Sequence, residues 1–436
     1  MQLGRAAHWR VSSSVAALLL AISAVAGPAL AASEDIPDQE FGVIGDWGGL
    51  RGDLKDKGWT FEGREKFEAA TNVDGGSKEA AAAANELMIG VTADLQKLVG
   101  LSGGTVQAMV TDRAGDELGP RAGLAPAMQF IEVYGRGQRW RLTQLWYEQA
   151  FADKKIDLKL GRIGPGNDFD AFSCDFENLT FCGSTPGNLT GGDWYNWPVS
   201  QWGGRAKAQI GSVYLQAGAY QVNRRNLYHG FDVSFGGAQG VLAPAEVGWT
   251  PKLGSAGLPG TWVVGGWYSN VTAPDVLLDQ AGDAWRVSGR PPLDRNGRYG
   301  AYLSIEQQVT GKPKGKGLTL FLNAIQADRR TSLMDRQIAL GATYQGLIPG
   351  RDKDQIALAA GWTHFNSRAA AGERLALDAG TSMQPPQHTE FAVELDYRFK
   401  PLKGLVLTPN LQVVRDVGGV AGRKATVLGF KAVAKL

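Results

Sequence analysis

The sequence predicts an all-β protein, a transmembrane antiparallel β-barrel of sixteen strands, and three observations support this fold class. Segments of about ten residues alternate apolar and polar side chains, which is typical of strands with one wet and one apolar face. After the first 31 residues, no apolar run approaches the roughly 20 residues of a transmembrane helix. The remaining length, about 405 residues, suits sixteen strands with their turns and loops.

The composition excludes several other classes of protein. Of 436 residues, 44% are hydrophobic, 20% are charged and 59 are glycine, which excludes a disordered chain and a collagen-like repeat. A soluble β-sandwich has the same alternation but is usually smaller. Aromatic residues towards the ends of the segments favour a barrel, because membrane barrels carry aromatic girdles at both lipid interfaces.

Residues 1–31 are predicted to be a cleaved secretory signal peptide. Arg5 and Arg10 precede an apolar run from Val15 to Val25, and Ala29-Leu30-Ala31 has the small-x-small pattern of a cleavage site. Without the two arginines, the 45 basic residues fall to 43 and balance the 43 acidic residues. A nucleic-acid partner is not expected, because a phosphate-binding surface needs an excess of basic residues.

The mature chain divides into a short N-terminal segment and the barrel. Residues 32–58 are expected to be periplasmic, with a short helix near Trp47, and residues 59–436 are expected to form the barrel. The first five strands are predicted at residues 59–69, 87–95, 105–113, 141–151 and 156–162. Glu65 departs from the pattern, because it has the parity of Phe61 and Phe67. A carboxylate in lipid is costly, so a register shift, a subunit contact or an early strand end is implied.

The residues that could carry catalysis or bind metal are few. Cys174 and Cys182, the two cysteines of an exported chain, predict a local disulfide. The histidines lack the spacing of a zinc site, so no metal or cofactor is expected. Gly100-Leu101-Ser102-Gly103-Gly104 matches the turn of a catalytic serine, but a strand pattern follows it where a helix is required. We therefore predict that the protein is not an enzyme.

Two blocks of sequence carry a family resemblance. The first is Gly45-Asp46-Trp47-Gly48-Gly49-Leu50-Arg51, and the second includes Cys174-Asp175-Phe176-Glu177-Asn178, Trp194-Tyr195-Asn196-Trp197-Pro198 and Trp202-Gly203. In these blocks the chain resembles the carbohydrate-selective porins of the OprB family. The resemblance implies a sixteen-stranded outer-membrane barrel that passes sugars by diffusion, with a constriction built largely by an inward-folded third loop. The segment 163–200, which follows the fifth predicted strand, occupies the place of that loop.

A sugar at such a constriction requires particular chemistry. Its hydroxyls need donors and acceptors on both sides, and its C–H faces stack on aromatic rings. By strand parity, position in segment 163–200 or the resemblance, the candidate binding residues are Arg113, Trp146, Glu148, Asp168, Glu177, Asn178, Trp197, Trp202 and Arg205. Structural roles remain open for all of them, because lumen charges often form ion pairs and tryptophans often pack or form girdles.

The expected function is facilitated diffusion of carbohydrates, glucose-like monosaccharides in particular, across the outer membrane of a Gram-negative cell into the periplasm. The expected partners are sugars and outer-membrane lipid. The sequence leaves the oligomeric state open, with a homotrimer as one alternative. A general or anion-preferring porin is the alternative within transport, and it would need a ladder of Arg and Lys without acidic partners. A secreted sugar-binding or sugar-cleaving all-β protein is the alternative outside transport.

Overall fold

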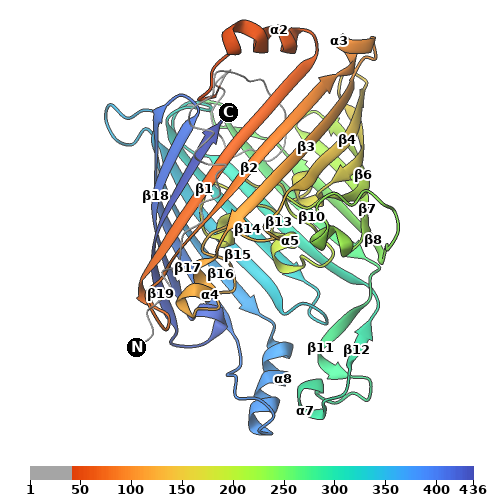
Figure 1. Cartoon of the computed structure of the whole chain (residues 1–436), viewed down its shortest axis with the longest axis vertical. Helices are drawn as coiled ribbons and strands as arrows, with labels where there is room; N and C mark the ends of the chain where they lie inside the picture. Colours follow the sequence, from red (N-terminus) through yellow and green to blue (C-terminus); the bar gives the residue numbers. More distant parts are fainter. Residues whose placement is uncertain (1–41) are drawn as a thin grey trace, which may run out of the picture.

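The computed structural model describes residues 42–436, so the predicted signal peptide lies outside the described residues. Long antiparallel strands form one closed sheet, in which β1 pairs with both β2 and β19 (Figure 1). The sixteen strands of the wall are β1 (Trp59–Gly75), β2 (Ala81–Asp94), β3 (Gly104–Gly115), β4 (Arg141–Phe151), β5 (Ile156–Ile163), β6 (Gln201–Ile210), β7 (Val213–Val222), β8 (Gly240–Trp249), β10 (Leu258–Ser269), β13 (Arg298–Gln308), β14 (Gly317–Ala327), β15 (Met334–Gln345), β16 (Gln355–Phe365), β17 (Thr389–Leu402), β18 (Leu405–Arg415) and β19 (Lys424–Lys435). The closed sheet confirms the predicted fold class.

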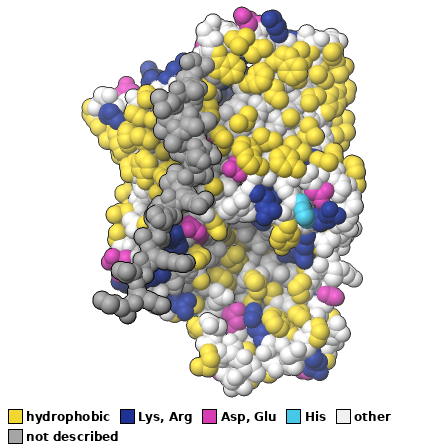
Figure 2. All heavy atoms as spheres, in the orientation of Figure 1, with side chains coloured by type: hydrophobic (Ala, Val, Ile, Leu, Met, Phe, Trp, Pro, Cys, Tyr) yellow, Lys and Arg dark blue, Asp and Glu magenta, His cyan; other side chains and the backbone are white. Residues whose placement is uncertain are grey.

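The strands present their apolar side chains outwards and their polar side chains inwards. In β17, Phe391, Val393 and Leu395 are exposed, whereas Glu394 and Asp396 are fully buried. The space-filling view shows the outward side chains as a broad hydrophobic band (Figure 2). This arrangement is the reverse of a soluble sandwich and suits a wall that faces lipid. No helix within residues 42–436 has the length and hydropathy needed to cross a membrane.

The two ends of the barrel differ in the length of their connections. Short turns, with α2 (Leu50–Asp56) and α3 (Leu95–Val99), lie at one end, and long loops with α7 (Trp285–Ser288) and α8 (Ser367–Asp378) lie at the other (Figure 1). Membrane barrels have short periplasmic turns and longer extracellular loops, which assigns the second end to the outside. The remaining short elements are η1 (Trp47–Gly49), α6 (Arg225–Tyr228), β9 (Lys252–Leu253), β11 (Ala273–Asp279), β12 (Pro292–Arg295) and η4 (Val417–Gly419).

Two long loops fold into the barrel, which we name L2 (residues 116–140) and L3 (residues 164–200). L2 joins β3 to β4 and contains α4 (Leu118–Ala122), and L3 joins β5 to β6. L3 contains η2 (Pro165–Asn167), η3 (Leu179–Phe181) and α5 (Thr185–Leu189), and α5 lies within the ring of strands in Figure 1. Phe130 of L2 and Trp194 of L3 are fully buried. The sequence predicted an inward L3, but it gave no expectation that L2 would accompany it.

Glu65 keeps its outward parity in the structure. It pairs with Leu87 in an unbroken register between β1 and β2, and β1 continues ten residues beyond it to Gly75. Its Oε1 accepts a 2.9 Å hydrogen bond from Nδ2 of Asn85. A register shift and an early strand end are therefore both wrong as explanations for this carboxylate.

Candidate functional site

A cavity of about 440 Å³ lies between the two inward loops and one side of the wall. Strands β1 to β4 provide the wall side, and L2 and L3 provide the opposite side. The polar and aromatic residues that line it are Glu62, Arg64, Lys66, Gln107, Arg113, Gln129, Glu132, Tyr134, Arg136, Gln144, Asn167, Phe172, Ser184, Asn188, Asn196 and Trp197. Of the candidates predicted from the sequence, Arg113 and Trp197 line this cavity.

Glu86 organises the wall of the cavity. It is fully buried on β2, and it receives Arg113 Nε at 2.7 Å and Arg64 Nη2 at 2.9 Å. The Nε1 of Trp197, from L3, donates a 2.8 Å hydrogen bond to the same carboxylate, and the Arg64 guanidinium lies 5.8 Å from the centroid of a Trp197 ring. The structure thus places an aromatic ring beside two guanidinium groups, all three fixed by one carboxylate.

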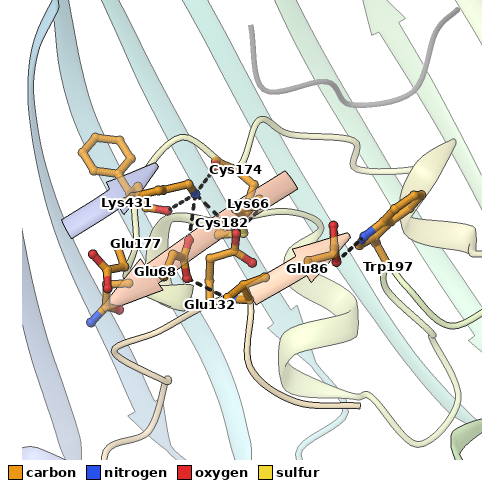
Figure 3. Close-up of polar contacts among 12 residues, drawn as sticks. Lys66, Glu68, Glu86, Glu132, Cys174, Glu177, Cys182, Trp197 and Lys431 are labelled. Carbon is orange, nitrogen blue, oxygen red and sulfur yellow. Dashed lines mark hydrogen bonds and ion pairs between the residues drawn. A yellow bond between two sulfur atoms is a disulfide. The ribbon is translucent and has the colours of Figure 1, made fainter. Parts of the chain in front are cut away.

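L2 contributes a carboxylate and a guanidinium that sequence reasoning missed. Glu132 Oε1 lies 2.5 Å from Lys66 Nζ and 3.3 Å from Lys431 Nζ (Figure 3). Arg136 donates hydrogen bonds of 3.1 and 3.2 Å to the carbonyls of Gly187 and Gly191 in L3. The signal for Glu132 is the largely apolar segment that surrounds it, Met128 to Tyr134, which is unusual for a loop exposed to water. Arg136 lies outside this segment.

A second charged group forms on β4 to β6 and L3, outside the residues that line the cavity. Arg205 lies 3.1 Å from Glu148 and 3.3 Å from Asp168, and it also pairs with Asp157. Lys159 lies 2.7 Å from Asp168, and its Nζ lies 4.8 Å from the centroid of a Trp146 ring. The structure therefore brings together four predicted residues, which are Trp146, Glu148, Asp168 and Arg205.

Glu177 and Asn178 hold L3 against the wall. Their backbone N–H groups donate hydrogen bonds of 2.8 and 2.9 Å to the carboxylate of Glu394 on β17. Their side chains bond to Asn410 at 2.5 Å and to Gln412 at 3.0 Å, both on β18. Both residues are 2% exposed or less, and neither lines the cavity.

Trp202, a candidate from the sequence, is not brought to the cavity. Its parity on β6 is opposite to that of the inward Arg205. The ring stacks on Phe235 with 4.7 Å between centroids, and Nε1 donates to the carbonyl of Val233.

Cys174 and Cys182 form the predicted disulfide within L3. The ring that it closes contains Phe176 and Phe181, whose ring centroids lie 5.4 Å apart. Both cysteines line the cavity, and their sulfur atoms lie near Glu132 within the described part of the chain. A metal site on these atoms would need free thiolates, which the disulfide removes.

The arrangement is suited to a small polyhydroxylated molecule. Arg64, Arg113 and Arg136 supply donors, Glu132 supplies an acceptor, and Trp197 supplies a flat apolar surface within one cavity. Such groups around one cavity can exchange hydrogen bonds with a solute without a covalent step.

Comparison with known proteins identifies the family of the chain. A family model described as the carbohydrate-selective porin, OprB family, matches residues 78–435. Porin B of Pseudomonas aeruginosa is 38% identical over 432 residues, which cover 94% of this chain and 95% of that protein.

Solved structures show the same relationship. The high-pH structure of Pseudomonas putida OprB superposes with a TM-score of 0.87 and 36% identity, covering 93% of this chain and 99% of that chain. The low-pH structure of the same protein gives a TM-score of 0.59 and 26% identity, covering 94% of this chain and all of that chain. The chain is therefore an outer-membrane porin that belongs to the carbohydrate-selective OprB family.

Proposed function

We propose that the protein conducts monosaccharides of the glucose type into the periplasm by facilitated diffusion, with no catalytic step. The observation that carries this proposal is the cavity of about 440 Å³, where donors, an acceptor and a tryptophan surround one space. A weak site of this kind raises the local concentration of sugar and still releases it.

Arg113 and Trp197 are the proposed sugar contacts from the predicted set. Arg113 is a planar donor that suits vicinal hydroxyls, and Trp197 suits the C–H face of a pyranose. Glu132 and Arg136 complete the proposed site from L2. Glu86 is proposed to position Arg113 and Trp197, because it bonds to both and is itself fully buried.

The other predicted residues receive different proposed roles. Trp146, Glu148, Asp168 and Arg205 are proposed to form a second contact region along the passage, since Glu148 keeps a 27% exposed side chain. Glu177 and Asn178 are proposed to hold segment 163–200 as the constriction loop. The prediction that residues 1–31 are a cleaved signal peptide is retained as a proposal.

Charge balance favours a sugar channel over an anion-preferring porin. An anion ladder needs cations without acidic partners, but Arg64 and Arg113 share Glu86, and Lys66 pairs with Glu132. A passage lined by paired charges offers donors and acceptors while its net field stays small.

We propose a homotrimer as the assembly. Glu65, Asn85 and Asp112 lie on neighbouring strands with outward parity, where polar groups are costly against lipid. A subunit contact at this patch would remove them from lipid. Chemical crosslinking of the protein in intact outer membranes tests this assembly, and a product no larger than one chain would contradict it.

Liposome swelling tests the proposed function. Full-length purified protein in liposomes should admit glucose faster than a neutral non-sugar of equal size and faster than a disaccharide. Arg113→Gln should reduce this preference, whereas Lys424→Gln should not, because Lys424 forms an exposed pair with Asp74. Equal rates for glucose and the non-sugar would contradict a selective site.

A further inference from the structure

L2 and L3 are bonded to each other beside the cavity. The N–H of Glu132 donates to the carbonyl of Glu177 at 2.9 Å, and the N–H of Leu179 donates to the carbonyl of Gln129 at 2.9 Å. Gln129, Glu132 and Leu179 all line the cavity. The distance between L2 and L3 at this junction therefore determines where one side of the passage lies.

Lys431 of β19 binds both loops with a single ammonium group. Its Nζ lies 3.3 Å from Glu132 Oε1 of L2, and it donates to the carbonyls of Cys174 at 2.7 Å and Phe176 at 3.0 Å in L3 (Figure 3). Glu68 of β1 lies 3.1 Å from the same nitrogen. The residue is 2% exposed, so water cannot replace these contacts without a change in structure.

Gln412 of β18, the strand paired with β19, makes a second bridge without any charge. Its Nε2 donates to the carbonyl of Phe130 in L2 at 3.1 Å, and its Oε1 accepts from Nδ2 of Asn178 in L3 at 3.0 Å. Gln412 is fully buried. Two neighbouring strands thus each contribute one buried side chain that joins L2 to L3.

We propose that Lys431 and Gln412 are positioning residues that set the size limit of the passage by holding L2 against L3. Neither residue lines the cavity, so neither contacts a sugar bound there. This inference rests on the proposed function, because it names what determines the size selectivity of that site.

Removal of the Lys431 ammonium group should weaken the junction between L2 and L3. Without Lys431, the carboxylates of Glu68 and Glu132 lose a shared counter-charge, and the carbonyls of Cys174 and Phe176 lose a donor. Buried acceptors without partners are costly, so water enters the junction and the loops separate. Because Glu132 and Cys174 border the cavity, separation of the loops widens the passage.

Variants of the full-length protein in liposomes test this inference. Lys431→Met should raise the ratio of disaccharide to glucose influx by about fivefold, and Gln412→Leu by about twofold. Lys431→Arg, which restores a cationic donor, should return the ratio towards that of the unmodified protein. Lys424→Met is the matched control on the same strand, and its ratio should not change, because its pair with Asp74 is exposed.

A heat-dependent shift in gel mobility reports whether each variant forms a closed barrel. If Lys431→Met fails to fold, Gln412→Leu decides, because it introduces no unpaired charge. Folded variants that keep the original ratio of disaccharide to glucose influx would overturn the proposal. A Lys431→Arg variant whose ratio is raised as much as that of Lys431→Met would also overturn it. Failure of the proposed function is distinguishable, because unmodified protein would then admit glucose and the size-matched non-sugar equally.

Discussion

The Nε1 of Trp197 donates a 2.8 Å hydrogen bond to Oε2 of Glu86, which joins L3 directly to strand β2 at the side of the cavity that Trp197 lines. The same oxygen accepts a 2.7 Å hydrogen bond from Arg113 Nε. One buried carboxylate therefore fixes both the aromatic ring and the guanidinium proposed to contact sugar. A substitution of Glu86, which is outside the lining, would therefore alter the positions of both side chains.

Trp197→Phe should reduce the rate of glucose influx. Phenylalanine keeps an aromatic face but loses the hydrogen bond to Glu86 that positions the ring. Because such a bond contributes about 0.5 to 1.5 kcal/mol, we expect a reduction of no more than about tenfold. Trp197→Ala should reduce the rate further, because the face itself is lost. Liposome swelling measures both, with Trp202→Phe as the control on the outer side of β6. Unchanged glucose influx in Trp197→Ala would contradict a sugar contact.

Glu86→Gln should make the channel more selective for anions. The change removes the negative charge that Arg64 and Arg113 share at 2.9 and 2.7 Å, so the passage gains a net positive field. Reversal potentials in planar bilayers under a salt gradient measure the shift, which should diminish at high salt. Asp352→Asn is the control, because Asp352 pairs with Lys316 at an exposed turn. A reversal potential equal to that of the unmodified protein would show that Glu86 does not govern the field.

Replacing both Cys174 and Cys182 with serine should raise disaccharide influx relative to glucose. The ring restrains the part of L3 that lines the cavity, and closure of so short a ring contributes about 2 to 3 kcal/mol on the chain-entropy model. Swelling rates with the two sugars measure the effect. A reducing agent should change the unmodified protein in the same direction and leave the double variant unaffected. A reductant effect of equal size in both proteins would locate the change elsewhere.

Sequence alternation predicted the wall of the barrel well, because the parity of side chains is a local property. The predicted fourth strand, residues 141–151, coincides with β4, and the first begins at Trp59 as β1 does. The inward L3 and its disulfide were also expected. These features depend on segments whose own residues carry the signal.

The site itself depends on contacts between distant segments, which alternation does not reveal. Glu86 and Trp197 are separated by 111 residues, so parity could place Glu86 inside but could not place L3 beside it. Glu177 and Asn178 are polar residues in a loop, and the sequence does not show which strand they face. They anchor the loop because Glu394 lies opposite their backbone N–H groups. Trp202 was chosen from its sequence block, and its parity on β6, opposite to that of Arg205, places it outside the set of residues that line the cavity.

The long loops at the extracellular end of the barrel, which contain β11 and α8, provide a prediction about how local stability depends on pH. Asp275 on β11 accepts N–H groups of Leu277 and Leu278 and pairs with Arg295 and Arg368, each at 2.8 Å. Burial opposes ionisation of its carboxyl group, but these donors outweigh burial and lower its pKa to about 2. Since the pKa in the folded state lies below the ordinary value of 3.8, the stabilisation is fully present above pH 3.8 and is lost as pH falls towards 2.

Hydrogen exchange in residues 273–279 measures this dependence. Protection, corrected for the intrinsic exchange rate, should stay constant from pH 7 to 4 and fall only as pH approaches 2. Asp275→Asn should show weaker protection at pH 7 and little further loss in acid, because the titrating group is absent. Asp294→Asn is the matched control, since Asp294 is an exposed aspartate on β12. A loss of protection centred above pH 4 would contradict the lowered pKa, because Asp275 would then be protonated at a pH above its ordinary pKa of 3.8.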